Sequence, residues 1–94
     1  MLTFSEMNDR YQFAKLMIDM HIYSVYTSTQ EPFRSDTDLV IVPCHGVCRD
    51  LSVEVFRRLT EDMHLKCSVQ TCDELTVSSN RCYRLLWKDG VWYA

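Results

Sequence analysis

Leu39-Val40-Ile41-Val42-Pro43 is the stretch of this 94-residue sequence that decides the fold. Four consecutive apolar side chains, three of them β-branched, are typical of a strand that is buried on both of its faces. Pro43 then ends the strand, because proline has no amide hydrogen to offer to a sheet. The sequence therefore predicts a buried β-strand over residues 39–42.

The residues after this strand predict a helix and then a second strand. Asp50 or Ser52 can cap a helix that runs to about residue 63. Its apolar face is formed by Phe56, Leu59 and Met63. Residues 65–70 alternate between apolar and polar side chains, as a half-exposed strand does. The span from residue 39 to residue 70 is long enough for a right-handed crossover between two parallel strands.

The segment before the buried strand predicts a helix, a strand and a loop. Thr3 and Glu6 have the spacing of a capping box at the start of a helix over residues 3–20. Residues 22–27 are rich in β-branched and aromatic side chains and predict a strand, whereas the polar residues 28–38 predict a loop. The helix carries apolar residues at helical spacing, namely Met7, Tyr11, Ala14 and Ile18, and a second set, namely Phe13, Leu16, Met17 and Met20. So wide a stripe predicts a helix that is either buried in one small core or covered by the sheet and by a partner chain.

The C-terminal residues predict a β-hairpin. Residues 82–87 alternate as a strand does, with Tyr83, Leu85 and Trp87 expected on one face. Asp89 and Gly90 follow as the residue pair that a type I′ turn prefers, and residues 91–94 return antiparallel. The last strand is short, so we expect it at the edge of the sheet.

Together these elements predict one two-layer α+β domain over residues 1–94. The expected order is α-β-β-α-β-β-β, with a mixed sheet, a C-terminal β-hairpin and both helices on one face of the sheet.

Composition narrows the class of protein. The net charge is −3, from 13 acidic and 10 basic residues that are interspersed, so the basic surface of a nucleic-acid binder is missing. No run is long and apolar enough to predict a membrane span, and the first residues lack the features of a signal peptide. We therefore expect a cytoplasmic protein with no nucleic-acid or membrane partner.

Cys44-His45-Gly46-Val47-Cys48-Arg49 places two thiols, an imidazole and a guanidinium in the turn before the second helix. The turn resembles the active loops of low-molecular-weight and other tyrosine phosphatases and of arsenate reductases, in which five residues separate a cysteine from an arginine. Only four separate Cys44 from Arg49. The resemblance implies a thiol-dependent oxyanion enzyme in which Cys44 is the nucleophile and Arg49 the oxyanion clamp, with Asp50 or Asp38 as general acid.

The cysteines also allow a zinc site. The sequence has five of them, and an odd number without a signal peptide argues against a disulfide framework. Two loose pairs could hold a structural zinc ion, with His45 and His64 as substitutes; the pairs are Cys44 with Cys48 and Cys67 with Cys72. The remaining interpretation is a tight turn in which Gly46 takes a positive φ and the thiols pack inward, with no cofactor.

Aromatic residues near the C-terminus favour a surface that binds another protein. Trp92 and Tyr93 are adjacent on the expected edge strand, so their rings should point to opposite faces of the sheet. One ring is then left for an interface, where Trp, Tyr and Arg are the usual anchors. The predicted partner-binding residues are Tyr83, Arg84, Trp87, Trp92 and Tyr93.

These observations favour a small non-catalytic protein-binding module over the thiol enzyme and over the zinc-stabilised domain. Compact accessory proteins of phages and mobile elements are often of this kind, so the hypothesis is an inhibitor or adaptor that acts on a host protein. Self-association as a homodimer, through the first helix or the last strand, is consistent with it.

Overall fold

The structure is a computed structural model, and it describes residues 7–28, 38–46 and 49–93. The chain order is α1 (Met7–Asp19), β1 (Ile22–Thr27), β2 (Asp38–Pro43), α2 (Ser52–Met63), β3 (Ser68–Thr71), α3 (Glu74–Ser78), β4 (Arg84–Lys88) and β5 (Val91–Trp92). This confirms the α+β class and each expected element. None of the helices in the described ranges is long and apolar enough to cross a membrane. The proposed capping box at Thr3 and Glu6 lies outside the described residues.

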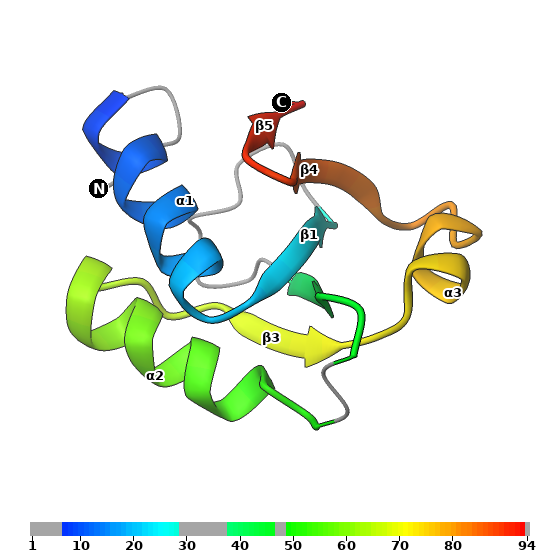
Figure 1. The fold of residues 1–94 in the computed structure, drawn as a ribbon, viewed down its shortest axis with the longest axis horizontal. Helices are drawn as coiled ribbons and strands as arrows, with labels where there is room; N and C mark the ends of the chain where they lie inside the picture. Colours follow the sequence, from blue (N-terminus) through cyan, green and yellow to red (C-terminus); the bar gives the residue numbers. More distant parts are fainter. Residues whose placement is uncertain (1–6, 29–37, 47–48, 94) are drawn as a thin grey trace.

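The five strands form one mixed sheet in the order β3-β2-β1-β4-β5 (Figure 1). β1 pairs antiparallel with both β2 and β4, and β5 pairs antiparallel with β4. β2 and β3 run parallel and are joined by α2, which confirms the crossover that the sequence predicted. The strand expected over residues 65–70 begins three residues later than expected, at Ser68.

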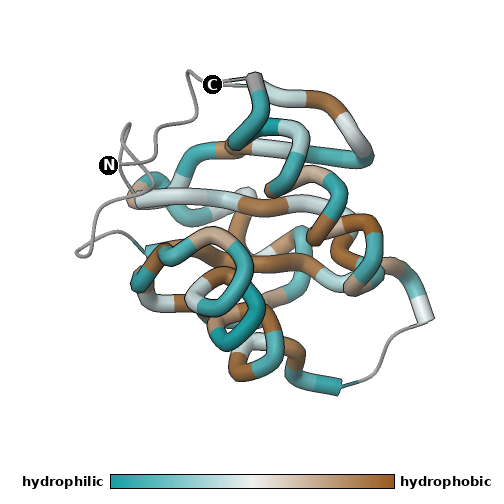
Figure 2. Tube along the Cα trace, turned by 90° about the vertical axis from the view of Figure 1, so that its left-hand side faces the viewer, coloured by the Kyte–Doolittle hydropathy of each residue, from teal (hydrophilic) through white to brown (hydrophobic). Residues whose placement is uncertain are grey.

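β2 is buried on both of its faces, as its apolar sequence predicted. Leu39 and Ile41 belong to the main core, which lies between the sheet and the helices α1 and α2. Val40 and Val42 point to the other face, where they pack in a smaller cluster with Tyr26 and Val77. The hydrophobic stretches run through the middle of the molecule, whereas hydrophilic residues occupy its outer turns (Figure 2).

α1 and α2 cover the same face of the sheet, as expected, but the faces they bury are shifted from the prediction. On α1, Tyr11 and Ile18 are exposed, and the buried apolar residues are Phe13, Leu16 and Met17. On α2, Phe56 is 42% exposed, and the core positions are Val55, Leu59 and Met63. The second apolar set of α1 is therefore the one that faces the sheet.

α3 was not predicted, and it changes the two-layer arrangement. This five-residue helix lies on the opposite face of the sheet from α1 and α2 and buries Val77 there. Asp73 caps it by accepting hydrogen bonds from the amide and the hydroxyl of Thr76, at 2.8 and 2.9 Å. The helix ends at Ser78, and Ser79 is its C-cap.

A β-bulge corrects the predicted face of β4. Val25 of β1 pairs with Trp87 and Tyr26 pairs with Leu85, so Leu86 is an extra residue in β4. Leu86 and Trp87 therefore both lie in the main core, while Leu85 packs with Tyr83 on the α3 side. The expectation that Tyr83, Leu85 and Trp87 share one face is wrong, because strict alternation ends at the bulge.

The C-terminal hairpin follows its sequence signal. Asp89 and Gly90 have φ values of +48° and +86°, as a type I′ turn requires, and β5 is an edge strand. Trp92 points toward the main core, and Tyr93 is 56% exposed, which confirms that the two rings lie on opposite faces.

We expect Gly90→Ala to lower the free energy of unfolding by about 1 kcal/mol, because a Cβ penalises positive φ by that order. The space around Gly90 is open, so the cost arises from the backbone alone. Urea denaturation measures the change, and Asp89→Asn is the control, since asparagine tolerates a positive φ. An unchanged free energy of unfolding in Gly90→Ala would contradict the turn geometry.

Candidate functional site

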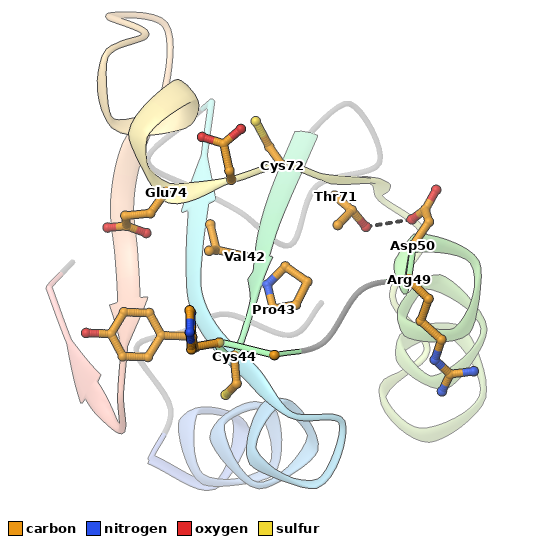
Figure 3. A pocket seen from close by; sticks show the side chains of 12 residues that line it. Val42, Pro43, Cys44, Arg49, Asp50, Thr71, Cys72 and Glu74 are labelled. Atoms are coloured by element: carbon orange, nitrogen blue, oxygen red, sulfur yellow. Dashed lines mark hydrogen bonds between the residues drawn. The ribbon is translucent and has the colours of Figure 1, made fainter.

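An open groove of about 810 Å³ lies where β2 and β3 end (Figure 3). Because these strands are parallel, their C-terminal ends bring the turn after β2 next to the turn before α3. The lining residues from these segments are Cys44, His45, Gly46, Arg49, Asp50, Thr71, Cys72, Asp73 and Glu74. The groove thus contains most of the residues that the sequence suggested for a thiol enzyme or a zinc site.

The turn after β2 does not bring Arg49 to Cys44. The amide of Cys44 donates to the carbonyl of His21 at 2.8 Å, and Gly46 has a φ of +94°, as expected. The guanidinium of Arg49 is 3.1 Å from the carboxylate of Glu54 on α2. In Figure 3 the Cys44 thiol points toward α1, and Arg49 points away along α2. Val47 and Cys48 lie outside the described residues.

The carboxylate of Asp50 connects the end of β3 with the start of α2. One oxygen of its carboxylate accepts hydrogen bonds from the hydroxyl of Thr71 at 2.6 Å and from the amide of Ser52, the first residue of α2, at 2.9 Å. The hydrogen bond from Thr71, followed by those from Ser52, lowers the pKa of Asp50 to about 2. A carboxylic acid of that strength is ionised at neutral pH, which does not favour the role of general acid.

Asp38, the other acid considered, lies at the far end of β2. Its amide donates to the hydroxyl of Ser28 at 3.1 Å. Asp38 is the first residue of β2, whereas Cys44 comes directly after the last. Asp38 is therefore separated from Cys44 by the whole length of β2.

The cysteines proposed as zinc ligands are spread over the fold. Cys67 is buried in the main core, where burial, followed by the charge of Asp38, raises the pKa of its thiol to about 11. Cys44 and Cys72 line the groove, and Cys48 lies outside the described residues. His45 is exposed in the groove, whereas His64 ends α2. Within the described ranges, no three His, Cys, Asp or Glu side chains form a group that could hold a metal ion.

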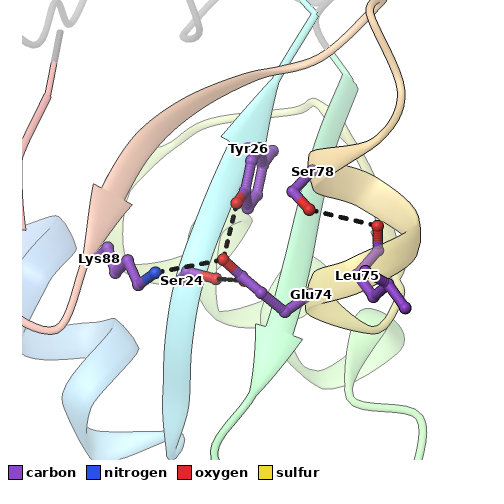
Figure 4. Close-up of polar contacts among 6 residues, drawn as sticks. All are labelled: Ser24, Tyr26, Glu74, Leu75, Ser78 and Lys88. Carbon is purple, nitrogen blue, oxygen red and sulfur yellow. Dashed lines mark hydrogen bonds and ion pairs between the residues drawn. The ribbon is translucent and has the colours of Figure 1, made fainter.

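Glu74, the first residue of α3, reaches across to the sheet (Figure 4). Its carboxylate accepts hydrogen bonds from the hydroxyls of Ser24 and Tyr26 on β1, at 2.7 and 2.8 Å. The ammonium of Lys88 on β4 lies 3.3 Å from the same carboxylate. These contacts, which we call the Glu74 cluster, tie α3 to two strands of the sheet.

The pKa values of the Glu74 cluster follow from this arrangement. Burial acts to raise the pKa of Glu74, but the hydrogen bonds from Ser24, Tyr26 and Lys88 outweigh it and hold the pKa below its usual value. Burial and the hydrogen bond to Glu74 raise the pKa of Tyr26 to about 12. The hydrogen bond to Glu74 also raises the pKa of Lys88. At neutral pH the cluster therefore holds a carboxylate, an ammonium and a neutral phenol.

Beside the Glu74 cluster, part of the sheet face is left uncovered by α3. Tyr23, Val91 and Tyr93 are exposed there by 36%, 53% and 56%, and the ammonium of Lys88 lies 5.4 Å from the centre of the Tyr23 ring. We call these four residues the Tyr23–Tyr93 patch. Tyr23 and Val91 were missed by the sequence analysis, because only a sheet that pairs β1 with β4 brings them to the hairpin.

The residues predicted to bind a partner do not form one surface. Trp87 is only 1% exposed, so its prediction as an interface residue is wrong; the bulge in β4 turns it into the core. Trp92 is half-buried between the ring of Phe13 and the guanidinium of Arg10, at 5.5 and 5.3 Å. Tyr83 is half-buried on the α3 side. Arg84 and Tyr93 remain exposed, and Tyr93 joins the patch.

Comparison with known proteins gives a likeness of fold. No protein-family model and no curated protein matches the sequence. Among solved structures, the chain is similar to one chain of a complex between the tri-AMPylated HEPN toxin of Shewanella oneidensis and the MNT antitoxin. The match has a TM-score of 0.55, covers 86% of this chain and 71% of that chain, and has 13% sequence identity. At this identity the likeness shows the fold alone.

We expect Glu74→Gln to lower the free energy of unfolding at neutral pH by about 1 kcal/mol. This is less than the roughly 1.5–3 kcal/mol typical of a hydrogen bond to a charged group, because the carboxylate is partly exposed to solvent. The folded-state pKa of Glu74 lies below the ordinary value of 4.5. Its stabilisation is therefore complete above that value and is lost as the pH falls through the lower folded-state pKa.

Urea denaturation of wild type and Glu74→Gln over an acid pH series measures this difference, which should shrink on acidification. Glu61→Gln on the exposed side of α2 is the matched control and should change nothing. A difference between wild type and Glu74→Gln that stays constant with pH would contradict the role of the carboxylate.

Proposed function

We propose that this chain is a non-catalytic protein-binding module that regulates one partner protein as its inhibitor or adaptor. The Tyr23–Tyr93 patch would be the surface that the partner covers, and the cytoplasm would be the site of action. The observation that carries the proposal is the uncovered sheet face beside α3, where two tyrosines and a valine remain exposed around one lysine.

The chemistry of the patch suits a protein interface. Tyrosine combines a large apolar ring with a hydroxyl, and it is among the residues that most often anchor interfaces. Lys88 is held by Glu74 at 3.3 Å, so its charge is paired before any partner arrives. A partner that covers the patch would therefore bury aromatic surface without leaving an unpaired ammonium, which is the costly case.

The structural likeness supports a role in a two-protein complex. The similar chain comes from an assembly of a toxin with an antitoxin, in which one protein binds another. We propose the same kind of pairing for this chain, with a toxin-like or otherwise regulated protein as its partner.

The thiol alternative receives no comparable support from the geometry. Arg49 is committed to Glu54, and the carboxylate of Asp50 is committed to Thr71 and Ser52. These two side chains are thus occupied by contacts within the protein and are not directed at a substrate. The exposed aromatic residues of the Tyr23–Tyr93 patch are explained by the binding proposal and not by the thiol enzyme.

The proposal is tested by capture of partners from the native host with the immobilised protein. The captured protein is identified by mass spectrometry and then titrated as a purified component. We expect Tyr93→Ala and Tyr23→Ala each to raise the dissociation constant about tenfold or more. A tenfold rise corresponds to the loss of an anchor residue worth about 1.4 kcal/mol.

Leu75→Ala is the matched control, because Leu75 is 79% exposed on α3, outside the patch. It should bind as the wild type does, and all three variants should keep the wild-type circular dichroism spectrum. Equal binding by the wild type and both tyrosine variants would show that the patch is not the partner surface.

A further inference from the structure

β3 forms the edge of the sheet opposite to the C-terminal hairpin. Its only strand neighbour among the described residues is β2, and α2 runs alongside it (Figure 1). The backbone of β3 has one row of amides and carbonyls toward β2 and a second row toward the outside. Such an outer row is a template for another strand.

The hydrogen bonds of the sheet show which residues form that outer row. The amide of Cys72 donates to the carbonyl of Ile41 on β2 at 3.1 Å. Backbone groups alternate along a strand, so those of Gln70 also point to β2, and those of Val69 and Thr71 point outward. Val69 and Thr71 can therefore donate to and accept from an incoming backbone.

Residues 68–71 lack three of the usual devices that prevent strand pairing, although β3 is itself a short strand of four residues. Charged side chains, proline and bulges normally protect an edge. Residues 68–71 are Ser, Val, Gln and Thr, all uncharged, and their register with β2 is continuous. By contrast, β5 at the other edge has only two residues.

α2 presents apolar side chains along the same edge. Val53, Phe56 and Thr60 follow one another at spacings of three and four residues, so they share one flank of the helix. The hydroxyl of Thr60 donates to the carbonyl of Leu65, in the connection to β3, at 3.1 Å, which orients this flank toward the β3 side. Val53 and Phe56 are 76% and 42% exposed there. A strand beside β3 would place alternate side chains against them.

Charges of opposite sign mark the two ends of the edge. Lys66 is exposed two residues before β3. Asp73 lies two residues after β3, and Asp50 is bonded to Thr71 at the same end. The nearby Arg49 is paired with Glu54. An incoming segment with an acidic residue near Lys66 and a basic residue near Asp50 and Asp73 would match this pattern.

We propose that the β3 edge is a second, separate binding site, which takes an extended segment of another protein as an added β-strand. The segment has alternate apolar residues that face Val53 and Phe56, and it has an acidic and a basic end that match Lys66 and the aspartates. A second copy of this chain is the competing occupant, because antiparallel pairing of two β3 strands would also bring Lys66 near Asp73, and the oligomeric state separates the two cases. The site shares no residue with the Tyr23–Tyr93 patch, so the two can fail independently.

A displayed library of ten-residue random peptides, selected on the intact protein, tests the proposal. Selected peptides should show alternate apolar residues with an acidic and a basic end, and exchange of the two charged ends should weaken binding at least fivefold. Val69→Pro removes an outward amide while the hydrogen bonds to β2 remain, and we expect it to weaken binding at least tenfold by fluorescence anisotropy.

Phe56→Ala is the second variant, and it keeps the test valid if Val69→Pro does not fold, since Phe56 is already partly exposed. It should weaken binding several-fold, whereas Leu75→Ala should not. The proposal is overturned if no peptide is selected, or if the selected peptides bind Phe56→Ala as tightly as the wild type. It is also overturned if sedimentation shows a dimer that Phe56→Ala dissociates, because the edge would then take a second copy.

Discussion

The burial of β2 on both faces is the constraint on which the rest of the structure depends. Leu39 and Ile41 need α1 and α2 on one side, while Val40 and Val42 need cover on the other. α3 provides part of that cover with Val77. A helix of five residues cannot hold its place by its own hydrogen bonds, so its docking depends on the carboxylate of Glu74 and on the partners of that carboxylate in the sheet.

This partial cover connects the fold to the proposed function. α3 lies over β1 and β2, and the hairpin side of the same face is left to Tyr23, Lys88, Val91 and Tyr93. The Glu74 cluster forms the border, because Lys88 belongs to the patch and is at the same time paired with the helix. Movement of α3 would therefore free the charge of Lys88 and change the surface that a partner meets.

Local signals in the sequence were sufficient for most of the fold. The apolar run at residues 39–42, the alternation after the second helix and the pair Asp89-Gly90 each depend on neighbouring residues, and each was confirmed. α3 was missed, because five mostly polar residues carry no helical period, although Asp73 three residues before Thr76 is a capping signal. The bulge in β4 was missed as well, because it arises from pairing with β1.

The candidate site was less predictable, since it depends on contacts between distant segments. Cys44, His45, Gly46 and Arg49 do line the groove, but Arg49 pairs with Glu54, a contact that the spacing of the turn did not suggest. Amide hydrogen exchange of the protein, alone and with its captured partner, tests the central claim most directly. The account predicts slower exchange at Tyr23 and from Val91 to Tyr93 in the complex. Unchanged exchange at those residues, with protection confined to the turn before α2, would contradict it.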